Sequence, residues 1–144
     1  MKKKLTMIFI SISIGILFTI LFLNKETFYA KEEYQVYAFQ VASFENLDNA
    51  TKYKSSLPSS IIIKEDNSYK VIVGIYKDID IVNKMLVYFE DNKIKIYLKN
   101  INVSKSFYTN LDNLEKILIN TTDNNVYNKV NQSILDLYIN GDKI

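Results

Sequence analysis

The residue types that carry most enzyme chemistry are either missing from this sequence or poorly placed in it. The chain contains no cysteine and no histidine, which excludes thiolate nucleophiles, disulfides, histidine general bases and the usual zinc ligands. The adjacent carboxylates Glu65-Asp66 and Glu90-Asp91 fall on predicted turns, away from the apolar surroundings that would raise the pKa of a general acid. We therefore expect no catalytic residue, no metal ligand, no cofactor and no enzyme activity.

The distribution of charge argues against nucleic acid as a partner. Every basic residue is a lysine, and the formal net charge is +2. Lys2, Lys3 and Lys4 precede an apolar stretch, and without them 15 basic residues face 16 acidic ones. Binding to nucleic acid depends largely on clustered basic side chains that neutralise phosphates. A nearly neutral domain without arginine has no such cluster.

An N-terminal segment is predicted to anchor the chain in a membrane. Leu5 to Leu23 carries no charge, and as a helix it would span about 28 Å, the thickness of a hydrocarbon core. The lysines before it place the N-terminus in the cytoplasm by the positive-inside rule. We therefore expect a cytoplasmic tip and single-pass anchor at residues 1–23, a linker at residues 24–33, and an extracytoplasmic remainder.

A cleaved signal peptide is the competing interpretation of this segment, because it also begins with a positive region followed by an apolar one. Ala30 has the small side chain expected of the last residue removed. Phe28, however, stands two residues earlier, where a second small side chain is expected. The apolar run is also longer than a normal signal core, which favours the uncleaved anchor.

The segment after the linker is predicted to begin with a strand, a helix and a hairpin. Residues 34–44 alternate as a strand does, and Asn46 or Asp48 is expected to cap a helix that stops at Pro58. The polar run from Glu65 to Ser68 predicts a turn between the strands 61–64 and 69–76. The face of the first strand expected in the core carries Tyr37, Phe39, Val41 and Ser43. The face expected to stay open carries Val36, Ala38, Gln40 and Ala42.

A second half repeats this plan. Asp78 or Asp80 is expected to cap a helix, and Ile94 to Leu98 is expected to form the last strand. A shift of 32 positions superimposes Val41 on Val73 and aligns the two predicted helices. The expected α+β fold has an N-terminal transmembrane helix, a βαββαβ four-stranded antiparallel sheet with two helices on one face, and a C-terminal helical hairpin. Apolar residues on the buried stripe of the second helix are Ile81, Val82, Met85, Leu86 and Phe89.

The predicted central strands contain the motifs Phe39-Gln40-Val41-Ala42-Ser43-Phe44 and Tyr69-Lys70-Val71-Ile72-Val73-Gly74-Ile75-Tyr76. These two motifs resemble the SPOR domain, a sporulation-related repeat. The resemblance covers residues 34–103. Three positions depart from the family pattern, which more often has glycine, arginine and proline. They are Ala42, Lys70 and Ile75.

The resemblance implies binding of peptidoglycan, in particular of glycan strands stripped of their stem peptides, at sites of cell division or wall remodelling. Planar amides, hydroxyls and aromatic faces recognise sugars. Gln40, Ser43, Tyr69 and Lys70 supply these groups near one another if the two central strands pair. Each residue also has a structural interpretation: Gln40 and Lys70 as solvated side chains, Ser43 as a strand end, and Tyr69 as a packing residue.

Residues 104–144 lie beyond the resemblance and are predicted to form a helical hairpin. One apolar stripe includes Phe107, Leu111 and Leu118, and a second includes Val130 and Ile134, with a break at residues 120–125. These stripes either pack back on the domain or bind a protein of the envelope or of the division machinery. The alternative function is accordingly a non-enzymatic interaction subunit of a membrane or envelope complex.

Overall fold

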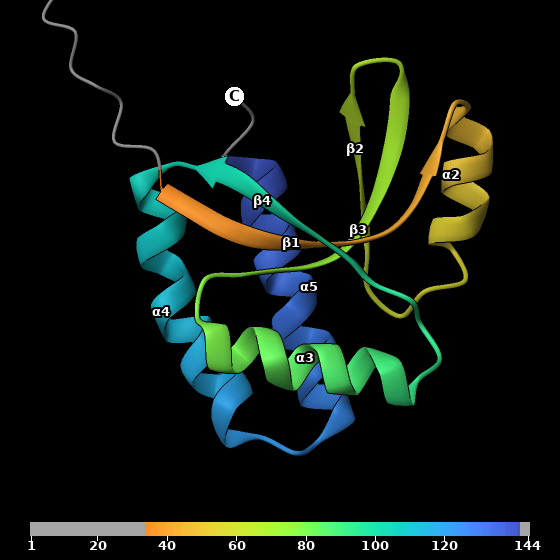
Figure 1. The fold of residues 1–144 in the computed structure, drawn as a ribbon. Helices are drawn as coiled ribbons and strands as arrows, with labels where there is room; N and C mark the ends of the chain where they lie inside the picture. The colour runs from red at the N-terminus through yellow and green to blue at the C-terminus, as the bar shows by residue number, and fades with distance from the viewer. Residues whose placement is uncertain (1–33, 142–144) are drawn as a thin grey trace, which may run out of the picture. The chain divides into compact units, whose positions relative to one another are not determined.

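The computed structural model describes residues 34–141. The predicted anchor and linker lie outside these residues, and no helix within 34–141 is long and apolar enough to cross a membrane. The described part confirms an α+β fold with a four-stranded antiparallel sheet that ends in helices (Figure 1). In chain order the elements are β1 (Tyr34–Phe44), α2 (Leu47–Lys54), β2 (Ile61–Glu65), β3 (Ser68–Tyr76), α3 (Ile79–Asp91), β4 (Tyr97–Val103), α4 (Lys105–Asn120) and α5 (Asn124–Gly141).

The sheet has the strand order β2-β3-β1-β4, so the strands that carry the two motifs are its central pair. β1 runs antiparallel to both β3 and β4. The register of β1 and β3 is irregular around Gln40, where two shifts mark a bulge. Bulges bend a strand and increase its twist, and Figure 1 shows the β2–β3 hairpin turned away from the direction of β1 and β4. Lys99 of β4 consequently forms an ion pair with Glu65 at the end of β2, although these strands are the two edges of the sheet.

The helices begin where the sequence places capping residues. The Asn46 side chain accepts a hydrogen bond from the backbone N–H of Asp48 at 2.7 Å, and the Asp78 carboxylate accepts one from Asp80 at 2.8 Å. These bonds satisfy N–H groups that have no partner within the helix. The end of α2 differs from the prediction, because the helix stops at Lys54 and tight turns lead to Pro58.

The last strand also differs from its predicted position, since β4 begins at Tyr97 rather than Ile94. Beyond the end of α3, Lys93 adopts a left-handed backbone with φ of 60°, and the Ile94 N–H bonds back to the Phe89 carbonyl. This is the hydrogen-bonding pattern that closes a helix end. It holds Ile94 against α3, so the strand-like alternation of residues 94–96 does not become part of the sheet.

The central strands are buried on both faces, which contradicts the expectation of an open sheet face. Every residue from Val71 to Tyr76 is buried, although successive side chains of a strand point to opposite faces. In β1, Val36 and Ala38 were expected to be open but are buried, whereas Ser43 was expected in the core but is exposed. A sheet covered by only two helices would not bury both sets, so the C-terminal helices must supply additional cover.

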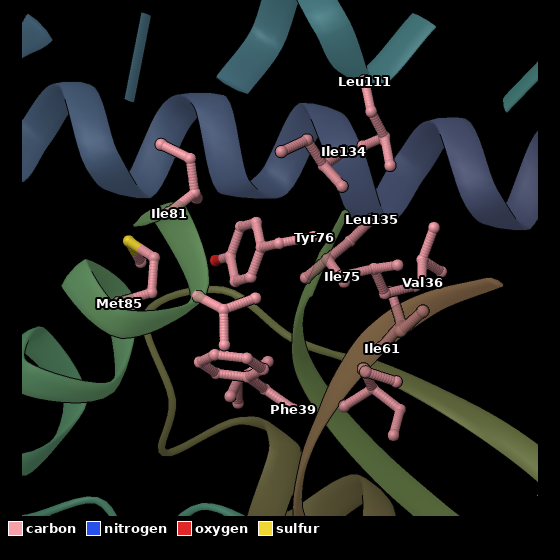
Figure 2. Close-up of a cluster of buried hydrophobic side chains, with 14 of the residues drawn as sticks. Val36, Phe39, Ile61, Ile75, Tyr76, Ile81, Met85, Leu111, Ile134 and Leu135 are labelled. Atoms are coloured by element: carbon pink, nitrogen blue, oxygen red, sulfur yellow. The ribbon is translucent and has the colours of Figure 1, made fainter. Parts of the chain in front are cut away.

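Each helix contributes a specific contact to this core. Phe39 packs edge-on against Tyr76 and also contacts Phe89 of α3. Figure 2 shows Tyr76 between Ile81 and Met85 of α3 and the side of α5 that carries Ile134. The remaining aromatic contacts to β1 are Tyr34 with Tyr108 of α4 and Phe44 with Tyr53 of α2.

A buried polar network fixes α5 to the sheet. Asn131 is buried, and its side-chain oxygen accepts a hydrogen bond from the Tyr76 hydroxyl at 2.6 Å. Its amide nitrogen donates to the Ser59 hydroxyl at 2.7 Å and to the Val73 carbonyl. Tyr76 in turn lies over Gly74, where an added Cβ would come within 2.5 Å of the tyrosine oxygen. The extension therefore packs back on the domain, and residues 34–141 belong to one compact unit.

Two charged side chains fasten α3 to α4. Glu115 is only 4% exposed, and its carboxylate accepts hydrogen bonds from the backbone N–H groups of Lys77 and Asp78 at the start of α3. Burial raises the pKa of Glu115 above its ordinary value, although these bonds oppose the shift. At the C-terminal end of α4, the Lys84 ammonium donates to the carbonyls of Leu118, Ile119 and Thr121, each at 2.9 Å.

Candidate functional site

Two of the four predicted site residues lie together at the hairpin end of the sheet. Ser43 of β1 is the register partner of Lys70 of β3, and the Lys70 ammonium donates a hydrogen bond to the Ser43 hydroxyl at 3.1 Å. Ser43 is exposed and Lys70 is half-buried. The pair thus presents one hydroxyl and one cation to solvent, and Lys70 forms no salt bridge within residues 34–141.

Tyr69 is separated from this pair by the geometry of the strand. It directly precedes Lys70 in β3 and so faces the opposite side of the sheet, where it is the register partner of Phe44 and lies under the Lys64 ammonium. A ligand on the Ser43–Lys70 side therefore does not meet the Tyr69 ring. The structural interpretation of Tyr69 as a packing residue fits this position better than a shared site.

Gln40 lies at the bulge and is only 9% exposed. Its side-chain oxygen is buried and has no hydrogen-bond partner among the described residues. An unpaired buried acceptor of this kind costs about 1–3 kcal/mol. The solvated-surface interpretation of Gln40 is therefore wrong, and the residue lies in a recessed position opposite Tyr97 of β4.

A groove between the end of α3 and the start of β4 was not anticipated from the sequence. It has a volume of about 490 Å³. Its half-buried apolar side chains are Leu86, Ile94 and Ile96, and its exposed charged side chains are Glu90, Lys93 and Lys95. The sequence does hold a signal for it, because a lysine lies after the helix end where glycine is usual, and Ile94 and Ile96 follow that lysine.

An exposed aromatic side chain adjoins this groove. Tyr97 is 51% exposed, and the Lys95 ammonium lies 5.2 Å from the centroid of its ring. Leu98, the next residue, is 44% exposed and is the register partner of Phe39. Aromatic faces with adjacent polar groups are common in sites that bind sugars and other amphiphilic molecules.

Two carboxylates of the described region already have partners within the fold. Glu65 is exposed and paired with Lys99, and the buried carboxylate of Glu115 is occupied by backbone N–H groups of the α3 start. Residues 34–141 contain no cluster of acidic side chains that could hold a metal ion.

No protein family model, curated protein or solved structure matches the chain.

Proposed function

We propose that the chain is a membrane-anchored, extracytoplasmic protein that binds peptidoglycan, with denuded glycan strands as its preferred ligand, at sites of cell division or wall remodelling. It acts by binding and not by catalysis. The supporting observation is the contact between Ser43 and Lys70, because it brings together on the surface one polar residue from each of the two SPOR-like motifs.

The chemistry of this pair suits a glycan stripped of its peptides. Removal of a stem peptide by an amidase leaves a free lactyl carboxylate on every second sugar, so the stripped strand is a polyanion rich in hydroxyls. A lysine ammonium donates to carboxylates and hydroxyls, and a serine hydroxyl both donates and accepts. Lys70 and Ser43 supply these groups where no ion pair of the described region competes for them.

A non-enzymatic interaction subunit of an envelope complex is the alternative, favoured by apolar side chains that the fold leaves uncovered. Ile117 and Ile119 of α4 are each 46% exposed, and Ile79 at the start of α3 is 54% exposed. The two predicted apolar stripes of the extension are largely used to pack on the domain. A protein partner would therefore meet these isoleucines and not the stripes.

Co-sedimentation with isolated peptidoglycan tests the proposal. The detergent-solubilised full chain is mixed with peptidoglycan before and after an amidase has removed the stem peptides. We expect enrichment on the stripped material, and several-fold less of a Lys70→Gln variant in the pellet. Lys64→Gln is the matched control, because Lys64 is on the same hairpin but pairs with Tyr69 on the opposite face. Absence of the wild-type chain from both pellets would overturn the proposal and favour the interaction subunit.

A further inference from the structure

The groove between α3 and β4 combines apolar side chains, which form its floor, with charged side chains at its rim that form no ion pair within residues 34–141. Glu90, Lys93 and Lys95 form no salt bridge within the described part of the chain, although all three line the same hollow. Two ammonium groups against one carboxylate give the rim a net charge of +1. Such a rim attracts an anionic ligand that also carries groups able to accept and donate hydrogen bonds.

Lys93 occupies a backbone position that is unfavourable for its side chain. Its φ of 60° is left-handed, and glycine is the usual residue at this point after a helix because it has no Cβ to clash there. Residues held in such conformations concentrate at functional sites. Here the left-handed residue is also a groove residue, so the strained position places an ammonium group at the rim.

The apolar floor of the groove and the aromatic ring beside it can contact the uncharged groups of a sugar. Leu86, Ile94 and Ile96 offer an apolar surface to the methyl groups of acetamido and lactyl substituents. The exposed Tyr97 ring offers a flat face to a pyranose. Glu90 accepts hydrogen bonds from hydroxyl or amide N–H groups.

We propose that this groove binds the lactyl-bearing sugar of a peptidoglycan glycan, and that Lys93 and Lys95 distinguish stripped from peptide-bearing strands by contacting the free lactyl carboxylate. This inference rests on the proposed function and adds the basis of its selectivity. In an intact strand the carboxylate is part of an amide bond to the stem peptide, so it has no charge for the lysines to bind. The stem peptide would also extend from that point into the space of the groove.

The groove and the Ser43–Lys70 pair lie within reach of one glycan strand. Gln40 of β1 is opposite Tyr97, which directly follows the groove residue Ile96, and Ser43 is three residues further along the same strand, opposite Lys70. Three residues of a strand cover about 10 Å. The groove therefore supplies selectivity for the carboxylate, while the pair extends the contact along the polymer.

The test compares two glycans and two charge-matched variants of the detergent-solubilised full chain. One glycan is fluorescently labelled and amidase-stripped, and the other is the same glycan with its lactyl carboxylates converted to simple amides. Lys93→Asn combined with Lys95→Gln removes both rim charges, and asparagine tolerates the left-handed backbone. Lys52→Gln combined with Lys129→Gln removes two exposed charges from α2 and α5 as the control.

We expect the groove variant to bind the stripped glycan about tenfold more weakly than wild type, and the control to remain within about twofold. The amidated glycan should bind wild type as weakly as the stripped glycan binds the groove variant. Equal binding of both glycans by wild type, or wild-type affinity of the groove variant, would overturn the inference and leave the proposed function intact. No binding of either glycan by wild type would overturn both.

Discussion

Replacement of Asn131 by alanine should destabilise the whole of residues 34–141, because this side chain joins α5 to β3 and to the loop before β2. The substitution leaves the buried Tyr76 hydroxyl and the Val73 carbonyl without their partner. Each unpaired buried group costs about 1–3 kcal/mol, and the lost side-chain volume adds to this. We therefore expect the free energy of unfolding to fall by about 3–5 kcal/mol.

Urea denaturation of the detergent-solubilised chain measures this loss. Far-UV circular dichroism follows the helices, and near-UV circular dichroism follows the packed tyrosine side chains, of which Tyr76 and Tyr127 are buried. Because α5 and the sheet share the network, both signals should change in one transition for wild type and for Asn131→Ala. Asn128→Ala is the matched control, since its oxygen accepts one long bond of 3.3 Å from the half-buried Tyr88. We expect that control to lose less than about 1 kcal/mol.

A milder variant keeps the experiment decisive if Asn131→Ala does not fold. Tyr76→Phe removes only the hydroxyl and should cost about 1–2 kcal/mol. Where Asn131→Ala does fold, the double variant should show a coupling energy of about 1–2 kcal/mol between the two positions. A loss below about 1 kcal/mol for Asn131→Ala, or separate transitions for helices and core in wild type, would refute the conclusion that the extension is part of the domain.

Three further predictions concern side chains that contact or close a helix end. Lys84→Met removes three hydrogen bonds from the end of α4 and should lower the free energy of unfolding by about 2 kcal/mol in urea denaturation. The exposed control Lys129→Met should change the free energy of unfolding by less than about 0.5 kcal/mol. Burial raises the pKa of Glu115 above its ordinary value of 4.5, so the contribution of this side chain to stability is greatest below that value and is lost as pH rises through the folded pKa. The stability of Glu115→Gln relative to wild type should therefore increase from pH 4 to pH 7. A difference that stays constant with pH would contradict the raised pKa. Lys93→Gly relieves the left-handed position and should stabilise the protein by about 0.5–1 kcal/mol while weakening glycan binding, and a destabilised variant would remove the basis for calling Lys93 strained.

The order of elements could be predicted from the sequence because local signals agreed with the final fold. Alternation in residues 34–44, the polar turn after Glu65 and the caps at Asn46 and Asp78 are short-range features, and all appear in the structure. The pairing of β1 with β3 followed from the repeat of the two halves. These signals depend on neighbouring residues and need no knowledge of what packs on the sheet.

The errors arose where distant segments decide the outcome. Alternation alone suggested one buried and one open face for β1, but α4 and α5 add cover that local patterning does not reveal. The bulge at Gln40 buried a residue expected on the surface. Ile94 to Ile96 alternate as a strand does, yet the hydrogen bonds that close α3 hold Ile94 against the helix. Of the candidate site, the Ser43–Lys70 contact was predictable from register, whereas the groove depends on that helix closure.

Titration of the isotopically labelled full chain in detergent with amidase-stripped glycan, followed by amide chemical shifts, tests the central claim most directly. Binding at the proposed site predicts saturable shifts at Ser43, at Lys70 and in residues 93–97. The amide shifts of α4 and α5 residues that lie away from this site should not change. Shifts confined to the exposed isoleucines of α3 and α4, or no shifts at saturating glycan, would contradict the account.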